Sequence, residues 1–420
     1  MQKRFTPDAG GVFPEWEEIE FGKLFQRRSE KNGEEFGVDK TISVATMHFK
    51  PEGNKADEKS LPKYKVMRTG DIAFEGHINK HFKHGRFVLN DIGDGIISPI
   101  FEVLQPVSEL SKEVPGFWKY YINYEPVMGK ILAKCANTGI MMNRLSIKDF
   151  YKQKIKVPCI EEQRKIAAAL AAYDEMIAVK TAKLETWQEC KKRMVKEIFG
   201  RTKRFKDDDG MEFPGWEEKT LGEVAELKNG FAFSAKSYDK DNSGDYRIIT
   251  IGNLQESKNI VISNKTKTVL KAPENIKEHQ VLKNGDILVA LTGATAGRVA
   301  LNVGINNLLN QRVGKLQIKD TANVDNEFLY HIVSQERFEK EMKKKGHGSA
   351  QPNLSKCDVE GFSFSLPCIE EQQKIGNFLA EIDKEIEIQK EFIKTYSDGK
   401  KRMMMELMGW KGNGRVKRIN

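Results

Sequence analysis

Cysteine is scarce in this sequence: five residues, an odd number, are scattered over 420 positions. Thiols this few and this widely spaced exclude a disulfide-stapled secreted domain. Cys159 and Cys368 each follow a proline, and no CxxC or HxxxH pattern stands near either of them. We therefore expect two buried thiols at these positions rather than a metal or redox centre.

Long apolar runs are also absent. The N-terminal stretch MQKRFTPDAGG holds no apolar segment, and the most apolar helical pattern, around residues 167–179, is interrupted by Asp174 and Glu175. A signal peptide needs an apolar central region, and a membrane-spanning helix needs about 20 predominantly apolar residues. We expect a cytoplasmic protein that makes no contact with a membrane.

The signatures of common catalytic sites are missing as well. The motif GATAG (293–297) lacks the GK[ST] of a phosphate-binding loop, and no GxSxG, HExxH or strand-associated GxGxxG occurs. Three of the seven histidines lie in HINKHFKHGR (77–86), but no cysteine or acidic residue accompanies them. We predict no catalytic residue and no metal site, and we interpret GATAG as a turn between strands.

The composition that is present describes a large, charged protein. A chain of 420 residues with 39% hydrophobic residues is long enough for two or three cores. Lysine and arginine number 69 against 60 aspartates and glutamates, a net charge of +9. This excess favours an anionic partner such as nucleic acid, although a basic surface that serves only solubility is nearly as good an explanation.

The most informative feature is an internal repeat. The motif FPEWEE at 13–18 returns as FPGWEE 200 residues later. Two further segments return 209 residues later, namely PCIEEQRKIAAAL (158–170) as PCIEEQQKIGNFL and KKRMVKEIFG (191–200) as KKRMMMELMG. Separate landmarks that recur in the same order indicate a tandem duplication.

Each repeat ends in a long amphipathic pattern. Apolar or aromatic residues recur at intervals of three and four, first at Ile166, Leu170, Tyr173, Ile177, Leu184, Trp187, Met194 and Ile198. The positions 209 residues later are again apolar or aromatic: Ile375, Leu379, Ile382, Ile386, Ile393, Tyr396, Met403 and Leu407. This spacing predicts two helices, each roughly 60 Å long, that pack against each other as a coiled coil. We expect them to run antiparallel, which would relate the two bodies by a pseudo-two-fold axis. The residues predicted at the helix–helix contact are Ile166, Leu170, Ile177, Leu184, Ile375, Leu379, Ile386 and Ile393.

Between these landmarks each half contains a body of short β-rich pieces separated by glycine and asparagine. Examples are RIITIGNL (247–254), GDILVAL (285–291) and GRFVLND (85–91). TGDIAFEG (69–76) corresponds to NGDILVAL (284–291), and RLSIKD (144–149) corresponds to NLSKCD (353–358). The predicted fold is α+β: two mixed α/β bodies separated by two long antiparallel helices, in a pseudo-two-fold tandem repeat.

Basic, glycine-containing segments lie inside both bodies, namely NKHFKHGR (79–86) and EMKKKGHGSAQPN (341–353). Their lysines could neutralise phosphates, and the amide and guanidinium groups of NQRVGK (310–315) could pair with base edges. For each segment alone, a solvated loop is an equally good explanation.

The paired FPxWEE motifs, the paired PxxEEQxKI helix starts, GDILVALTGATAGRV (285–299) and NQRV (310–313) occur together and in this order. In this arrangement the chain resembles the specificity subunit of a type I restriction–modification system over nearly its whole length. The resemblance implies two target-recognition domains, each recognising one half of a bipartite sequence in double-stranded DNA. The corresponding boundaries are 1–157 for the first domain, 158–200 for the first spacer helix, 201–366 for the second domain, and 367–420 for the second spacer helix and tail.

The resemblance also implies partners. Two modification subunits, which carry S-adenosylmethionine and methylate adenine, would bind the helices, and restriction subunits would join and cut with ATP and Mg²⁺. This chain would hold none of these cofactors and would not itself be an enzyme. By position, the DNA contacts would be Lys80, Lys83 and Arg86 in the first body and Thr292, Arg298, Asn310, Gln311, Arg312, Gln351 and Asn353 in the second.

Two alternatives remain at this point. A coiled-coil scaffold protein would bind DNA through charge alone, with no preference between sequences at equal salt. A self-contained methyltransferase or nuclease would need the catalytic motifs that the sequence lacks.

Overall fold

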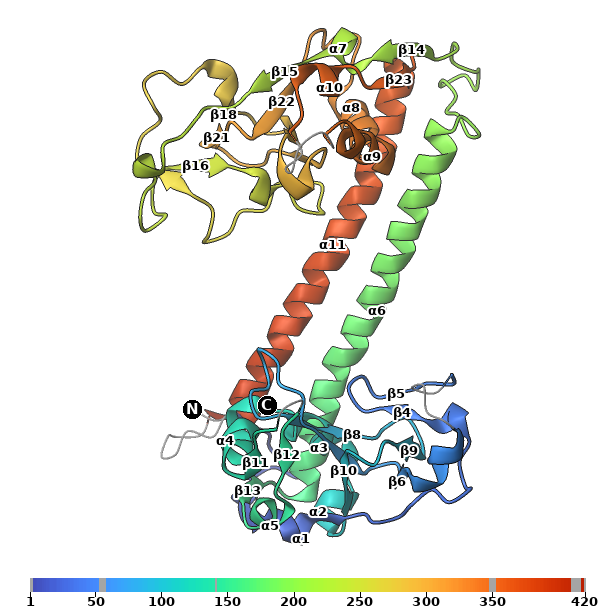
Figure 1. Ribbon diagram of the computed structural model, residues 1–420, viewed down its shortest axis with the longest axis vertical. Helices are drawn as coiled ribbons and strands as arrows, with labels where there is room; N and C mark the ends of the chain where they lie inside the picture. The colour runs from blue at the N-terminus through green and yellow to red at the C-terminus, as the bar shows by residue number, and fades with distance from the viewer. Residues whose placement is uncertain (1–2, 53–57, 140–141, 347–352, 409–416, 419–420) are drawn as a thin grey trace. The chain divides into compact units, whose positions relative to one another are not determined.

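The computed structural model describes residues 3–52, 58–139, 142–346, 353–408 and 417–418 of the chain (Figure 1). The chain forms two compact units. Unit 1 consists of Met1–Ala182 and Lys390–Asn420, and unit 2 consists of Lys183–Gln389. No helix in the described ranges is long and apolar enough to cross a membrane.

Two helices of 40 residues each dominate the secondary structure, α6 (Ile160–Phe199) and α11 (Ile369–Met408). Each begins two residues after a proline and has two glutamates in its first turn, where the positive end of the helix dipole favours negative charge. The boundary between the units falls inside both helices, so each unit contains a segment of each.

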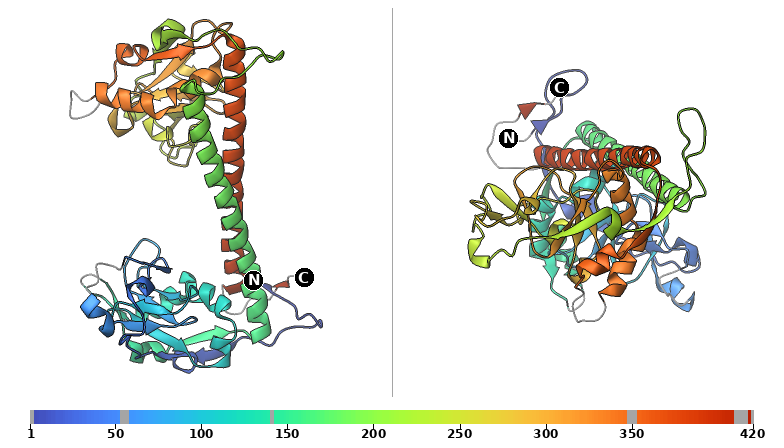
Figure 2. Two further views of the ribbon diagram at one scale, coloured as in Figure 1. Left: turned by 90° about the vertical axis from the view of Figure 1, so that its right-hand side faces the viewer. Right: turned by 90° about the horizontal axis from the view of Figure 1, so that it is seen from above.

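Within each unit the two helix segments run antiparallel, as the repeat predicted. In unit 1, Leu170 of α6 shares a core cluster with Leu407 of α11, while Tyr173, further along α6, lies against Tyr396 with ring centroids 6.5 Å apart. The left view in Figure 2 shows the two long helices side by side. Five of the predicted contact residues are buried, namely Ile166, Leu170, Ile375, Leu379 and Ile386, and three are half-buried, namely Ile177, Leu184 and Ile393.

The buried helix residues contact the bodies as well as the opposite helix. Ile166 and Leu170 share a cluster with Phe117 and Trp118 of unit 1, and Ile375 and its neighbours share one with the core of unit 2. The apolar stripe therefore anchors each body to the helix pair.

The two units share one sheet topology, which confirms that the bodies have a common fold. The order β3-β10-β7-β8 in unit 1 matches β15-β22-β19-β20 in unit 2, and all these neighbours are antiparallel. The unit 1 strands are β3 (Phe25–Arg27), β7 (Ile72–Glu75), β8 (Arg86–Leu89) and β10 (Glu102–Pro106). The unit 2 strands are β15 (Ala225–Asn229), β19 (Ile287–Ala290), β20 (Val299–Leu301) and β22 (Val313–Ile318).

Smaller sheets differ between the units. Unit 2 has a second four-stranded sheet in the order β17-β16-β21-β18, formed by β16 (Tyr246–Ile249), β17 (Thr268–Val269), β18 (Val281–Leu282) and β21 (Asn307–Leu309). Unit 1 has three two-stranded pairs instead: β4 (Ile42–Ser43) with β5 (His48–Phe49), β6 (Lys65–Met67) with β9 (Gly95–Ile97), and β11 (Ala136–Asn137) with β12 (Arg144–Leu145). The bodies have therefore diverged around a shared central sheet.

Short helices cover the central sheets. Unit 1 has α1 (Phe21–Leu24), α2 (Glu109–Lys112), α3 (Pro115–Tyr121), α4 (Glu125–Cys135) and α5 (Ile147–Tyr151). Unit 2 has α7 (Leu221–Val224), α8 (Asn326–Val333), α9 (Glu336–Lys345) and α10 (Lys356–Glu360). At the chain ends, β1 (Lys3–Arg4) pairs in parallel with β24 (Lys417–Arg418).

The repeated FPxWEE motif leads into a strand pair that each unit repeats. β2 (Glu17–Glu20) pairs with β13 (Lys154–Val157), and β14 (Glu217–Thr220) pairs with β23 (Ser363–Leu366). The tryptophan of each motif then donates its indole N–H to a glutamate in the first turn of a long helix. Trp16 Nε1 lies 3.0 Å from Glu162 Oε2, and Trp216 Nε1 lies 2.9 Å from Glu371 Oε2.

An arginine completes each of these anchors. Arg4 donates two hydrogen bonds to Glu162, and Arg204 donates two to Glu371 at 3.2 and 2.6 Å. Glu162 and Glu371 are almost fully buried. Because a buried carboxylate needs compensating donors, the repeated tryptophan and arginine account for the motif's return.

A second duplicated contact joins the helices. Asp174 of α6 pairs with Lys400 of α11 in unit 1, and Asp383 of α11 pairs with Lys191 of α6 in unit 2, each at 2.5 Å. Asp174 and Asp383 occupy the same repeat position, as do Lys191 and Lys400, so the two contacts are reciprocal.

All five cysteines are free. Cys159 and Cys368 are half-buried, so the prediction of two buried thiols was wrong. Each lies just before a long helix, where its backbone carbonyl accepts the amide of Gln163 or Gln372 at 3.0 Å. The structure thus uses their main chain at the start of each long helix.

Candidate nucleic-acid interface

The predicted contact residues of unit 2 flank the connection between β19 and β20. GATAG forms a 3₁₀ turn, Gly293–Thr295, which confirms its interpretation as a turn between strands. Gly293 and Gly297 have φ of 76° and 83°, a region that favours glycine. Thr292 and Arg298 stand at the two ends of this turn.

Leu291 brings several of these residues onto neighbouring backbone segments. Its amide donates to the Arg312 carbonyl at 3.0 Å, and its carbonyl accepts the Leu354 amide at 2.8 Å. Thr292 and Asn353 form a β-bridge beside it. Thr292, Arg312 and Asn353 are therefore adjacent although 61 positions of sequence separate the first from the last. Gln351 lies outside the described residues.

The side chains on these neighbouring segments differ in whether they are exposed and free to contact a ligand. Gln311, Arg312 and Asn353 are exposed, and no hydrogen-bond or ion-pair partner of the Arg312 guanidinium occurs in the described part of the chain. Asn310 is buried, and its Oδ1 accepts the Arg312 amide at 3.1 Å, so this amide shapes the turn. Arg298 lies 3.4 Å from the exposed Glu256.

In unit 1 the corresponding connection joins β7 and β8. Lys80 and Lys83 lie on it and are exposed. Arg86 begins β8 and is half-buried, because its guanidinium contacts Glu75 at 2.6 Å and the Ala45 carbonyl at 2.5 Å. Neither lysine side chain has a hydrogen-bond or ion-pair partner among the residues that the structure describes, so both are available to phosphate, whereas Arg86 already has an internal partner.

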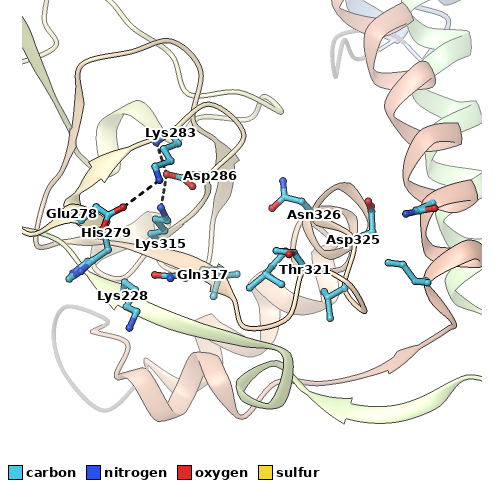
Figure 3. Close-up of a pocket in the computed structure, with 15 residues that line it drawn as sticks. Lys228, Glu278, His279, Lys283, Asp286, Lys315, Gln317, Thr321, Asp325 and Asn326 are labelled. Carbon is cyan, nitrogen blue, oxygen red and sulfur yellow. Dashed lines mark hydrogen bonds and ion pairs between the residues drawn. The ribbon is translucent and has the colours of Figure 1, made fainter.

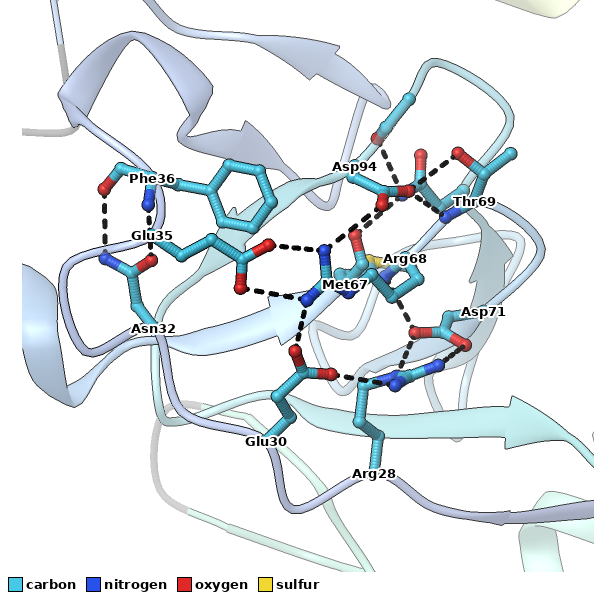
Figure 4. Close-up of polar contacts among 12 residues, drawn as sticks. Arg28, Glu30, Asn32, Glu35, Phe36, Met67, Arg68, Thr69, Asp71 and Asp94 are labelled. Atoms are coloured by element: carbon cyan, nitrogen blue, oxygen red, sulfur yellow. Dashed lines mark hydrogen bonds and ion pairs between the residues drawn. The ribbon is translucent and has the colours of Figure 1, made fainter.

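A network of ion pairs holds the β6–β7 turn of unit 1 (Figure 4). Arg68 contacts Glu35 and Asp94, at 2.6 and 3.3 Å, and also contacts Glu30. Arg28 links the same Glu30 to Asp71, at 2.8 and 2.6 Å. Each arginine here has carboxylate partners, so the network fixes the loop and offers no vacant charge to a ligand.

The network should make unit 1 sensitive to acid. The hydrogen bond from Arg68 lowers the pKa of Glu30, and the Thr69 amide lowers the pKa of Asp94, while burial raises the pKa of Asp71. Because the pKa values of Glu30 and Asp94 are lowered in the folded state, these carboxylates stabilise the fold above their ordinary pKa values of 4.5 and 3.8. This stabilisation is lost as pH falls through the lowered pKa values of the folded state. The raised pKa of Asp71 acts in the opposite direction.

We expect Arg68→Ala to lower the melting temperature more at pH 7 than at pH 3, because the variant removes a partner that acts only on ionised carboxylates. Thermal unfolding at the two pH values measures this difference. Arg164→Ala is the control, since its exposed guanidinium lies 3.5 Å from Glu113 and such surface pairs contribute little. An equal loss at both pH values would contradict the prediction.

Unit 2 has an open groove of about 710 Å³ beside β22 and the start of α8 (Figure 3). Its lysines resemble a phosphate site at first sight, but each has an acidic partner. Lys315 lies 2.9 Å from Asp286, Lys283 lies 3.5 Å from Glu278, and Lys228 lies 2.6 Å from Glu226. Lys228 and Lys356 lower the pKa of Glu226 to about 2. This neutralised groove is a poor candidate for an anion site.

Other titratable groups are structural. No group of three or more His, Cys, Asp or Glu side chains in the described ranges could hold a metal ion. Burial lowers the pKa of His331 well below its ordinary value and raises that of Cys135 to about 12. These side chains are neutral parts of the core.

Comparison with known proteins supports one family. The family model described as "Type I restriction modification DNA specificity domain" matches residues 103–186 and 214–395, together more than half of the chain. The MjaVIII specificity subunit of a type I restriction enzyme from Methanocaldococcus jannaschii is 28% identical over 340 residues, covering 78% of this chain and 76% of that protein. The putative MjaX specificity subunit from the same organism is 27% identical over 404 residues, covering 93% and 90%.

Solved structures show the same fold. The S subunit of a type I restriction–modification system from M. genitalium aligns with a TM-score of 0.63 and 15% identity, over 96% of this chain and 99% of that one. A chain from a structure on complex assembly and conformational transition of the type I R-M system aligns with a TM-score of 0.51 and 18% identity, over 95% and 98%.

Proposed function

Because this chain belongs to the family of type I restriction–modification DNA specificity subunits, we propose that it is the non-catalytic, DNA-recognising subunit of such a complex. One observation carries the proposal. The same sheet order occurs in both units, yet the connections β7–β8 and β19–β20, which carry the candidates Lys80, Lys83, Thr292 and Arg298, differ in sequence. A shared framework with different loops suits two domains that recognise different halves of a bipartite target.

In this proposal the bodies at 1–157 and 201–366 are target-recognition domains, and the helices at 158–200 and 367–420 set the spacer between half-sites. The helices also bind two methyltransferase subunits. Exposed apolar residues on them support this role: Met176 and Val179 of α6 are 37% and 47% exposed, and Phe392 of α11 is 40% exposed. Apolar side chains left in water on a helix surface suit a partner protein.

The remaining components are expected in the partners. S-adenosylmethionine would bind the methyltransferase subunits, ATP and Mg²⁺ would bind the restriction subunits, and the assembly would act in the cytoplasm on double-stranded DNA. The residues of this chain would contribute recognition and spacing.

The test is the adenine methylation pattern of a cell that carries this chain and its methyltransferase, with and without the gene for this chain. We expect a split motif that disappears on deletion. An unchanged pattern would favour the scaffold alternative, in which the chain binds DNA through charge alone. Binding that shows no preference between sequences at matched salt would support the same alternative.

Arg312→Ala should weaken recognition of the second half-site. The exposed guanidinium has no partner in the described ranges, and a bidentate contact between arginine and guanine contributes about 1–3 kcal/mol of discrimination. The expected result is a loss of about 10- to 100-fold in affinity for the half-site, with one base position relaxed. A binding titration of the reconstituted complex measures the affinity, and methylation profiling measures the relaxed position. Unchanged affinity and motif would remove Arg312 from the interface.

A further inference from the structure

Unit 1 contains a site that corresponds to the backbone contacts of Leu291 in unit 2. In unit 2, the backbone after β19 meets the backbone that precedes α10, where Asn353 begins NLSKCD. In unit 1, the backbone after β7 meets the backbone that precedes α5, because the Asn143 amide donates to the Gly76 carbonyl at 2.9 Å. Arg144 begins RLSIKD and so occupies the position of Asn353.

Unit 1 builds this place differently. The hairpin of β11 and β12 puts Asn137 opposite Arg144. The hairpin crosses the chain so closely that a Cβ atom on Gly76 would lie 2.0 Å from the Asn143 carbonyl oxygen. Only glycine permits this approach, so Gly76 determines where the hairpin stands.

A pocket of about 920 Å³ lies at this crossing. Phe74, Ile100, Met142 and Leu145 give it apolar walls, and Ile100 is 64% exposed. The side chain of Asn143, which also lines it, is 3% exposed, and its Oδ1 has no partner in the described residues. A buried amide oxygen without a donor needs an explanation, and a ligand or water that enters the pocket would supply the donor.

Within the described residues, Arg144 is the one cation on the pocket wall without a partner, since His77 lies 3.7 Å from Glu75. Glu102, on the wall, accepts two hydrogen bonds from Arg27 at 2.9 Å and one from Lys65 at 3.4 Å. Arg144, at the rim, is exposed and has neither a hydrogen-bond nor an ion-pair partner in the described ranges. A free guanidinium beside an apolar wall suits a planar ligand edge that carries two acceptors.

We propose that this pocket is the base-recognition site of the first half-site, with Arg144 donating to the major-groove edge of a guanine. Ile100 and Met142 would contact the apolar edge of a neighbouring base, as the thymine methyl group offers. Lys80 and Lys83, on the neighbouring loop, would contact phosphates and carry no sequence information. The proposal rests on the function proposed above and adds the residues that decide the first half-site.

The test uses the full complex with its methyltransferase subunits, with Arg144→Lys as the main variant. Lysine keeps the charge but loses the two-pronged donor geometry. We expect one base position of the first half-site to relax, with about 10- to 100-fold less discrimination for guanine there, while the spacer and second half-site stay unchanged. Arg312→Lys is the matched control and should relax the second half-site only.

The salt dependence of binding separates base recognition from phosphate contact. A double variant, Lys80→Ala with Lys83→Ala, should weaken binding to all sequences and reduce the salt slope, whereas Arg144→Lys should leave the slope unchanged. If the Arg144→Lys motif matches the wild type, and Arg144→Ala only weakens binding uniformly with a smaller slope, Arg144 contacts phosphate and the proposal is wrong.

If the proposed function itself is wrong, the methylation experiments would give a different result. A wild-type complex that methylates no split motif would overturn the proposed function, whatever the Arg144 variants do. A wild-type complex with a split motif and an unaltered first half-site in both Arg144 variants would overturn only the pocket. Melting curves of each variant check that the fold is intact.

Discussion

Replacing Arg204 with alanine is expected to lower the free energy of unfolding of unit 2 by about 3–5 kcal/mol, because Glu371 would remain as a buried, uncompensated charge. Glu371 is 0% exposed, and Arg204 supplies two of its hydrogen bonds. Denaturation of the purified chain in urea, followed by circular dichroism, measures the loss.

Two further variants give this prediction its control. Lys203→Ala removes an exposed cation one residue away and should change stability by less than about 0.5 kcal/mol. In a Glu371→Gln background, Arg204→Ala should cost much less than in the wild type, since no charge is stranded. Equal costs in both backgrounds would show that Arg204 acts through packing alone.

The repeat predicts the same behaviour at the other anchor. Arg4 and Glu162 are 4% and 1% exposed, so Arg4→Ala should destabilise unit 1 in the same way. The tryptophan N–H that reaches Glu162 is neutral and cannot replace the lost cation.

Inserting four residues after Ala182 in α6 and four after Gln389 in α11 is expected to abolish methylation at the original target. Each insertion lengthens its helix by roughly 6 Å, which corresponds to about two base pairs of DNA. If the helices set the spacer, the same two half-sites should reappear with a spacer about two base pairs longer. Long-read sequencing of methylated genomic DNA measures both the motif and its spacing.

The insertion sites coincide with the boundary between the units, so the core clusters of both bodies stay intact. Lys183→Ala, an exposed position at the same place, is the control and should leave the motif unchanged. If the insertion variant still methylates the target with the original spacer, the proposal that the helices set the spacer length is wrong.

Some features of the candidate site could be predicted from the sequence, because they depend only on residues close together in the chain. GATAG with its two glycines predicted a turn, and the exposed positions of Lys80, Lys83, Gln311 and Arg312 accord with polar loop segments. What these side chains contact depends on distant residues. Arg86 looked as available as its lysine neighbours, yet Glu75 and the Ala45 carbonyl hold it.

Other parts of the site were missed because their signal is not local. The correspondence of RLSIKD with NLSKCD was sufficient to align Arg144 with Asn353 in the repeat, but Arg144 was not among the predicted contacts. The pocket next to it forms only where Asn143, just before β12, crosses Gly76, a contact between residues 67 positions apart. Neither composition nor spacing reports such a crossing.

The sequence by itself determined the duplication, the two long helices and the shared fold of the bodies, and the structure confirms the antiparallel pairing that we expected. Helix periodicity is a pattern of neighbouring residues, and the repeat is visible by comparing the two halves of the sequence, so neither needs the tertiary structure. Only the tertiary structure decided that each compact unit takes a segment of both helices, that Arg4 meets Glu162, and which cations are paired and which are free. The ion pairs follow from packing, because a charged side chain pairs with whichever oppositely charged residue the fold brings within a few ångströms of it.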